Sequence, residues 1–296
     1  MNYYLAATAL RAFSATGPTK ALYRWLGNRK TDRKLSMERA GWVLDRIAEA
    51  DLGPAPAFLE LGTGWMHAYS MLPALIHDGE TACFDVWDNR AFGALKAKLP
   101  VLRQALDGLD LSPDRRARAE QRLAAMQRAE SFDEVYAVLN MRYDIDHDGR
   151  LPYADNHFDV IFSVDVLEHV VASGFDRNAA DWFRVLKPGG RMVAQVGLDD
   201  HLAHYDPSRS KKHYLRHSKA TFDRLLENDV QYINRIPASD MIARLEKTGF
   251  RTLKAERWTV DDPDSLPVHA DYADQPREDI VTWRLLLTVE KPAPTS

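Results

Sequence analysis

Cysteine is almost absent from this sequence, since Cys83 is the only one in 296 residues. A lone cysteine excludes an intrachain disulfide and a metal site built from several thiolates. Cys83 falls in a predicted central strand, where a small thiol packs as an apolar residue. Long apolar runs are also missing, and none approaches the length that a membrane span requires.

Excess positive charge is lacking too. The formal net charge is -4 at pH 7 and the sequence pI is near 6.2, which gives no reason to expect a nucleic-acid partner. The first residues also lack the basic start and the uninterrupted apolar core of a signal peptide, because Arg11 divides them. We therefore expect a cytoplasmic protein without a transmembrane segment.

The length of the chain suits a single α/β domain with additions. We expect residues 1–50 to form a helical N-terminal cap and residues 51–296 to form the main domain. Charged helical sequence between the second and third motif strands, described below, predicts an insert at residues 95–135. A second insert is expected at residues 198–248.

The predicted cap combines aromatic and basic residues, with Asp32 and Glu38 as its only acids before residue 40. We expect its apolar side chains, among them Tyr3, Trp25 and Leu26, to pack on the core. The charged face then lies in solvent; the alternatives are a lid over the substrate pocket and a peripheral contact of residues 1–40 with anionic lipid or a phosphate-bearing substrate. The basic residues are Arg11, Lys20, Arg24, Arg29, Lys30, Arg33, Lys34 and Arg39.

The motif around which the chain is organised is an apolar strand that breaks into a glycine turn. Residues 58–61 predict the strand, Gly62-Thr63-Gly64 the turn, and residues 66–76 a helix. Glycine allows the backbone to turn sharply and a ligand to approach it closely. A strand–Gly-x-Gly–helix unit places that ligand at the carboxyl end of the strands, near the helix N-terminus.

A nicotinamide or flavin site is the first alternative for this turn. Such sites carry a third glycine three residues after the second, and here that position is His67. Glu60 also lies two residues before the first glycine, where a carboxylate would repel a pyrophosphate. A ligand with an ammonium or sulfonium charge suits that carboxylate better, which favours S-adenosylmethionine (SAM) over a dinucleotide.

Three further motifs follow along the chain. A strand over 81–85 ends in Asp85, about twenty residues after the glycines, a spacing that suits a carboxylate bound to ribose hydroxyls. The Leu151-Pro152 turn leads into a strand that reaches Ser163, and residues 185–193 combine a helix end, a Pro-Gly-Gly turn and another strand. In this order the motifs resemble the class I SAM-dependent methyltransferase family, in its small-molecule branch.

The resemblance implies an α/β fold: a Rossmann-like sheet with helices on both faces, closed by an antiparallel pair of strands over 250–258 and 281–290. The helical N-terminal extension and an insert before the last two strands would be additions to it. It also implies SAM as the cofactor and S-adenosylhomocysteine as its product. The residues that the resemblance assigns to the cofactor are Glu60, Gly62, Thr63, Gly64, Asp85, Val86, Trp87, Asp144, Ile145 and Ser163.

Different residues of that set would contact different parts of the cofactor. The backbone of the glycine turn would approach the cofactor closely, and Asp85 would bind the ribose. Glu60 and Ser163 would lie near the methionine end. Adenine would lie against Val86 or Trp87, with Asp144 or Ile145 at its edge.

Several histidines fall in segments predicted to border one pocket. An oxygen nucleophile needs a base, and histidine suits this near neutral pH. The candidates are His169, after the third motif strand, and His201 and His204, after the next one. We also considered a metal at His201 and His204 with the nearby aspartates, and a calcium loop over 144–149. Two histidines at this spacing are common without a metal, and the loop lacks the glutamate at its twelfth position, so we expect no metal site.

The leading hypothesis is a SAM-dependent methyltransferase that acts on oxygen or nitrogen of a small molecule, with a sugar or natural-product intermediate favoured. One alternative is a SAM-binding protein with other chemistry, such as decarboxylation or hydroxylation. Another is a non-catalytic SAM-binding or interaction protein. The segment 201–217 carries imidazoles, tyrosines, lysines and an arginine, and we expect it to contact the acceptor.

Overall fold

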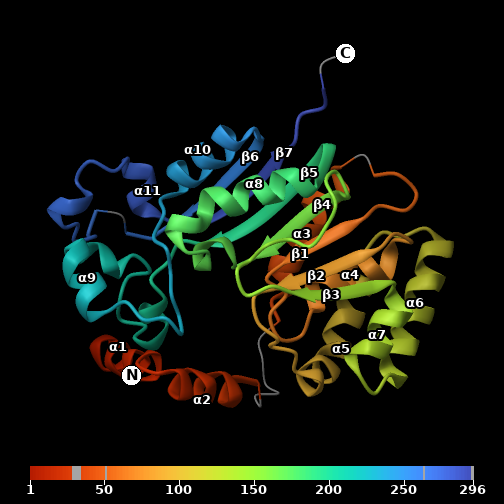
Figure 1. The fold of residues 1–296 in the computed structure, drawn as a ribbon, viewed down its shortest axis with the longest axis horizontal. Helices are drawn as coiled ribbons and strands as arrows, with labels where there is room; N and C mark the ends of the chain where they lie inside the picture. Colours follow the sequence, from red (N-terminus) through yellow and green to blue (C-terminus); the bar gives the residue numbers. More distant parts are fainter. Residues whose placement is uncertain (29–34, 51, 263, 295–296) are drawn as a thin grey trace.

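One seven-stranded sheet forms the centre of the molecule (Figure 1), and the strands follow each other in the order β3-β2-β1-β4-β5-β7-β6. The computed structural model describes residues 1–28, 35–50, 52–262 and 264–294. Strands β1 to β5 are parallel, and β7 is antiparallel to both β5 and β6, as the resemblance predicts. The strands are β1 (Phe58–Leu61), β2 (Thr81–Asp85), β3 (Met141–Ile145), β4 (Phe158–Val164), β5 (Leu186–Gly197), β6 (Arg251–Thr259) and β7 (Thr282–Glu290).

The register of the parallel strands brings their carboxyl ends to one edge of the sheet. Leu61 of β1 lies beside Phe84 of β2 and Ser163 of β4, and Ser163 in turn lies beside Ala194 of β5. The residues that follow these strands are therefore neighbours in space. In a parallel α/β sheet this edge is the usual place for a ligand.

Helices cover both faces of the sheet. Helices α8 (Phe175–Val185) and α10 (Ala238–Thr248) pack their apolar residues on one face, in the largest core cluster. Helices α3 (Met37–Ala48) and α4 (Ala68–Ile76) contact the strands on the other side through residues such as Val43 and Met71. The predicted Rossmann-like arrangement is confirmed, and α3 belongs to the core of the domain.

The long connection between β2 and β3 is helical, as its sequence predicts. It contains α5 (Phe92–Asp107), α6 (Pro113–Arg128) and α7 (Phe132–Leu139), which pack with α4 in one apolar cluster. The second insert carries α9 (Lys219–Leu225) and the short turns η3 (His201–Tyr205) and η4 (His213–Arg216), and α11 (Arg277–Val281) precedes β7.

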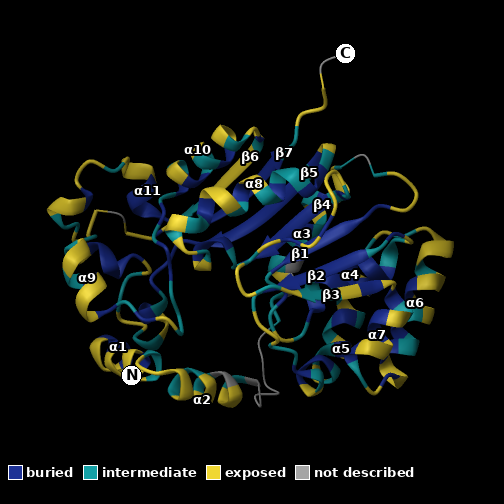
Figure 2. Ribbon diagram, viewed as in Figure 1, coloured by how far each residue is buried: buried dark blue, intermediate teal, exposed yellow. Residues whose placement is uncertain are grey.

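The first helix is fastened to the second insert. In α1 (Tyr3–Ser14), the buried Tyr3 hydroxyl donates a 2.7 Å hydrogen bond to Asp200, and the Met1 amino group donates one of 2.8 Å to the Tyr205 carbonyl. Helix α2 (Gly17–Asn28) continues from α1 along the same edge of the molecule (Figures 1 and 2). The start of the chain thus contacts η3 and the residue before it.

The prediction that Trp25 and Leu26 pack on the core is wrong, because they are 50% and 45% exposed. Half of the predicted basic cluster, namely Arg29, Lys30, Arg33 and Lys34, lies outside the described residues, as does Asp32. Two of the others form ion pairs: Lys20 pairs with Asp229, and Arg39 with Asp165. None of the described helices combines the length and the apolar character that crossing a membrane requires.

Candidate functional site

The glycine turn at the end of β1 has left-handed backbone at both glycines, with φ of +67° at Gly62 and +65° at Gly64. The two positions differ in their surroundings. A Cβ at Gly62 would lie 2.5 Å from Val166 Cγ2, whereas a Cβ at Gly64 would meet no atom within 4 Å. Gly62 is therefore required by packing against Val166, and Gly64 leaves its backbone open to a ligand.

Asp85 connects the end of β2 to this turn. One carboxylate oxygen accepts a 3.1 Å hydrogen bond from the Gly64 N–H, and the other accepts one of 2.8 Å from the Val86 N–H. The side chain is buried, and burial raises the pKa of the carboxyl. Trp87 follows at the surface, with its ring 4.5 Å from that of His147. Asp85 thus lies beside the turn, at the edge where the resemblance places it.

Glu60 is buried beneath the turn and has a partner that the sequence analysis did not consider. Its carboxylate accepts a 3.1 Å hydrogen bond from the Ser70 N–H and a second one from the Ser70 hydroxyl. Burial raises the pKa of Glu60 to about 7. The carboxylate is therefore held by Ser70 of α4.

Unpartnered polar atoms gather at the same edge of the sheet. The hydroxyls of Thr63 and Ser163 are buried without a hydrogen-bond partner among the described residues, whereas Asp144 Oδ2 lies 3.7 Å from Arg142 Nε. Ile145, beside Asp144, is 39% exposed. Buried polar atoms are normally paired, so free hydroxyls beside the open backbone of Gly64 fit a polar cofactor such as SAM.

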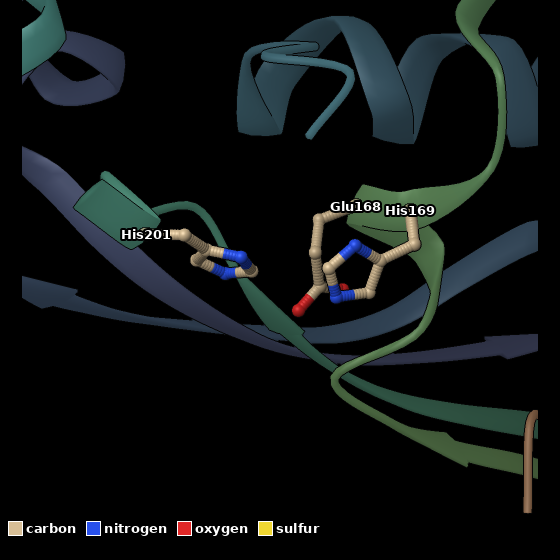
Figure 3. Close-up of side chains that lie close together, drawn as sticks. All are labelled: Glu168, His169 and His201. Carbon is tan, nitrogen blue, oxygen red and sulfur yellow. The ribbon is translucent and has the colours of Figure 1, made fainter. Parts of the chain in front are cut away.

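The predicted catalytic histidines meet on the other side of the same edge (Figure 3). Glu168 and His169 lie in η1 (Leu167–His169), which follows β4, and His201 begins η3, which follows β5. The ring centroids of His169 and His201 are 5.0 Å apart, and those of His201 and His204 are 5.2 Å apart. The parallel pairing of β4 with β5 thus brings together three rings from two distant segments.

Three carboxylates surround Gly197 in this region. A Cβ built on Gly197 would lie 2.8 Å from Glu168 Oε1, 3.1 Å from Asp199 Oδ1 and 3.4 Å from Asp165 Oδ1. Asp165 pairs with Arg39 and accepts a 2.6 Å hydrogen bond from Gln195, while Asp199 accepts one of 2.5 Å from His204. A side chain at position 197 would enter this group of oxygens, which explains the glycine.

Burial and the short distances between these residues shift the pKa values of the carboxylates and histidines. Burial and the nearby Asp165 raise the pKa of Glu168 well above its usual range. Burial and the neighbouring His169 lower the pKa of His201 to about 4. The hydrogen bond to Asp199 raises the pKa of His204. His201 is therefore neutral at pH 7, whereas Asp199 favours the protonated form of His204.

Two small neighbouring hollows, each of about 10 Å³, lie beside this group of residues. Asp200 and His201 contribute to the first, Glu168 and Asp199 to the second, and Ile233 to both. Residues of the segment 228–236, which belongs to the predicted second insert, line both hollows. Arg39 and Gln195, which hold Asp165, were not predicted. Nothing in the local sequence pattern of these residues indicates that they reach this edge.

Comparison with known proteins identifies the domain. Residues 92–194 match a family model described as a methyltransferase domain. The match begins at α5, after the glycine turn, and ends within β5. It therefore includes the helices between β2 and β3, and also β4, the strand before Glu168.

Several solved structures are similar at low sequence identity. Phosphoethanolamine N-methyltransferase 2 of Haemonchus contortus, in complex with SAM, is 14% identical, with 86% of this chain and 52% of that chain covered and a TM-score of 0.49. A SAM-dependent methyltransferase from Methanosarcina mazei is 14% identical, with coverage of 82% and 95% and a TM-score of 0.46. The [4+2]-cyclase SpnF is 16% identical, with coverage of 88% and 84% and a TM-score of 0.47.

At TM-scores this low, the assignment rests on the matched domain and on the strand order with its antiparallel closing pair, not on these structures. Residues 92–194 are thus similar to a methyltransferase domain, and the strand order is the one that the resemblance to class I SAM-dependent methyltransferases predicts.

Proposed function

We propose that the protein transfers the methyl group of SAM to oxygen or nitrogen of a small molecule, with a sugar or natural-product intermediate as the favoured acceptor. The observation that carries the proposal is that two different groups of residues lie at the carboxyl ends of the parallel strands. The open glycine turn lies at the end of β1, and the histidine cluster with its two hollows lies at the ends of β4 and β5. A cofactor and an acceptor bound on these two sides would face each other.

On the cofactor side, the chain would bind and orient its ligand. SAM supplies a methyl group already activated by the positive sulfur. Backbone at Gly64 gives close approach, the free hydroxyls of Thr63 and Ser163 offer hydrogen bonds, and Asp85 fixes the turn while presenting carboxylate to the ribose. Holding both reactants in line is the main contribution that a protein makes to such a displacement.

On the acceptor side, we assign the role of base to His204. Its Nε2 lies 2.5 Å from Asp199 Oδ2, so the carboxylate orients the ring and leaves Nδ1 to take a proton. In other catalytic sites a carboxylate likewise orients the histidine that acts as the base. His169 and His201 line the same place, and the proton of the acceptor would pass to His204 Nδ1.

Helices α1 and α2 would cover the acceptor side rather than anchor the chain to lipid. The buried Tyr3 and its bond to Asp200 seat α1 on the insert, while Leu22, Trp25 and Leu26 leave an exposed apolar group on α2. We expect no co-flotation with anionic vesicles at physiological salt, because the apolar group is small and half-covered. Stable co-flotation that is lost in the triple variant Leu22→Ser, Trp25→Ser, Leu26→Ser would show a membrane contact instead.

A labelled-methyl assay tests the reaction itself. The protein is incubated with SAM carrying a labelled methyl group and a panel of small sugars, phenols and amines, and the small-molecule and protein fractions are counted separately. We expect label in a small molecule bearing a hydroxyl or amine, with one S-adenosylhomocysteine formed per methyl transferred. Label only on protein, or SAM bound without any transfer across the panel, would contradict the proposal.

A further inference from the structure

The Glu168–His169–His201 cluster has the composition of a metal-binding site. One carboxylate oxygen and one nitrogen from each ring lie within 4.8 Å of one another, and Figure 3 shows the three side chains turned toward a common space. Donor atoms bound to a single transition-metal ion at about 2.1 Å lie at most about 4.2 Å apart. The cluster therefore needs to close only slightly to hold an ion.

The hydrogen bonds around the cluster already orient two of the three donors. His169 Nδ1 lies 2.5 Å from the carbonyl oxygen of Tyr232, so this nitrogen carries the proton and Nε2 keeps its lone pair. A backbone carbonyl that fixes the tautomer in this way is the usual outer partner of a metal-bound histidine. Glu168 Oε1 accepts a 3.0 Å hydrogen bond from the Gly197 N–H, which holds the carboxylate in place.

The second oxygen of Glu168 has no hydrogen-bond partner in the described part of the chain, although the residue is only 2% exposed. Buried carboxylate oxygens without partners are costly. Figure 3 shows this carboxylate directed between the two imidazoles. An ion bound there would satisfy the oxygen that the protein leaves free.

The balance of charge also favours a cation. Asp165 and Asp199 lie beside Glu168, and each has a basic partner, Arg39 and His204 respectively. Among the residues that the structure describes, no cationic side chain pairs with Glu168. A divalent cation bound there would take the place of the proton that this crowded carboxyl otherwise holds.

We propose that Glu168, His169 and His201 bind one divalent transition-metal ion, with Zn²⁺, Co²⁺ or Mn²⁺ as the matching class. Two imidazoles and one carboxylate are a donor set that such ions accept, while leaving positions open for another ligand. Mg²⁺ and Ca²⁺, which prefer oxygen donors, suit it less well. The sequence pairs His201 with His204, a spacing that is common without a metal, but in the structure Asp199 lies against His204 Nε2.

The role of the ion, unlike its binding, rests on the proposed function. An open coordination position at the cluster would take an oxygen of the acceptor and hold it near His204, whose ring centroid lies 5.2 Å from that of His201. Hydroxyl groups bind such ions more readily than protonated amines do, since an ammonium group has no lone pair. The site therefore favours oxygen over nitrogen as the atom that is methylated.

The test measures metal binding by tag-free protein that has been stripped with a chelator and dialysed. Zn²⁺ binding is followed by calorimetry, and the visible spectrum of bound Co²⁺ reports the donor atoms. We expect one ion per chain in the wild type. Glu168→Gln and His201→Ala should each weaken binding by at least a hundredfold, because even outer partners of metal ligands contribute tenfold to a hundredfold.

A matched control comes from the opposite edge of the sheet. His157 pairs with Glu80 just before β4, so it offers one imidazole and one carboxylate without the third donor. His157→Ala should bind Zn²⁺ as the wild type does. Glu168→Gln keeps the size of the side chain and an oxygen for the Gly197 N–H, so it carries the test alone if His201→Ala does not fold.

Less than one ion per chain in the wild type, or unchanged affinity in folded Glu168→Gln, would overturn the site. A loss of binding in His157→Ala equal to that in His201→Ala would also overturn it, since binding would then be adventitious. None of these readouts involves methyl transfer. Failure of the metal site and failure of the proposed reaction are therefore separate results.

Discussion

Replacing Gly64 with alanine is expected to weaken the binding of SAM and S-adenosylhomocysteine at least tenfold in a protein that remains folded. The position faces open space, so an added methyl group meets no protein atom within 4 Å and instead enters the side from which the cofactor approaches. Gly62 is less informative, because a side chain there would collide with Val166 whether or not a ligand is bound. Titration calorimetry with S-adenosylhomocysteine measures the effect.

Gly189 provides the matched control for this substitution. It has a similar left-handed backbone, with φ of +80°, and open space around its Cβ position, but it lies near the amino end of β5. Alanine at either site should cost about 1–2 kcal/mol of stability from the backbone conformation. Denaturant unfolding should show similar losses for the two variants, with cofactor affinity reduced in Gly64→Ala alone. Equal affinities would exclude the glycine turn from the cofactor site.

The second large effect is expected at the acceptor side, where His204→Ala should lower kcat by about a hundredfold or more and leave the affinity for SAM nearly unchanged. A positioned base contributes this much to the rate, and SAM is bound by the turn at the end of β1. Since the base acts in its neutral form, activity in the wild type should fall as the pH drops through the pKa of His204. That pKa is raised above the ordinary value of about 6.5 by Asp199.

Asp199→Asn separates a catalytic role from a structural one. Removing the carboxylate lowers the pKa of His204, so the acidic limb of the pH–rate profile should move to lower pH even as the maximal rate falls. A purely structural role for Asp199 would reduce the rate at every pH without moving the limb. Full activity of His204→Ala across the pH range, or loss of SAM affinity in that variant, would remove His204 from the role of base.

The fold was predictable because its signals are local. Three apolar strands each have a characteristic residue or turn at one end. These are the glycine turn after β1, the acid that ends β2 and the Pro-Gly-Gly turn in β5. Their order along the chain then indicated the sheet and its cofactor side. His67, which argued against a dinucleotide, is buried with Nδ1 2.8 Å from the Tyr136 hydroxyl, so the position serves packing.

The acceptor side depends on contacts that no local pattern reveals. Glu168 meets His201 only because β4 and β5 pair in parallel and Gly197 leaves space between them. Helix α1 reaches Asp200, 197 residues further along the chain, through one tyrosine hydroxyl. Ser70 holds Glu60 because α4 turns back over β1, whereas the sequence alone suggested a carboxylate free to meet the cofactor.

A crystal structure with bound S-adenosylhomocysteine is the measurement that tests the proposed arrangement of cofactor and acceptor sides most directly. We expect the adenosine beside Asp85 and Gly64, and the sulfur facing His201 and His204 across a space that admits one acceptor group. Reacting atoms in such a geometry approach to about 3–3.5 Å. A sulfur turned away from the histidines, or a cofactor seated in the hollows lined by segment 228–236, would contradict it.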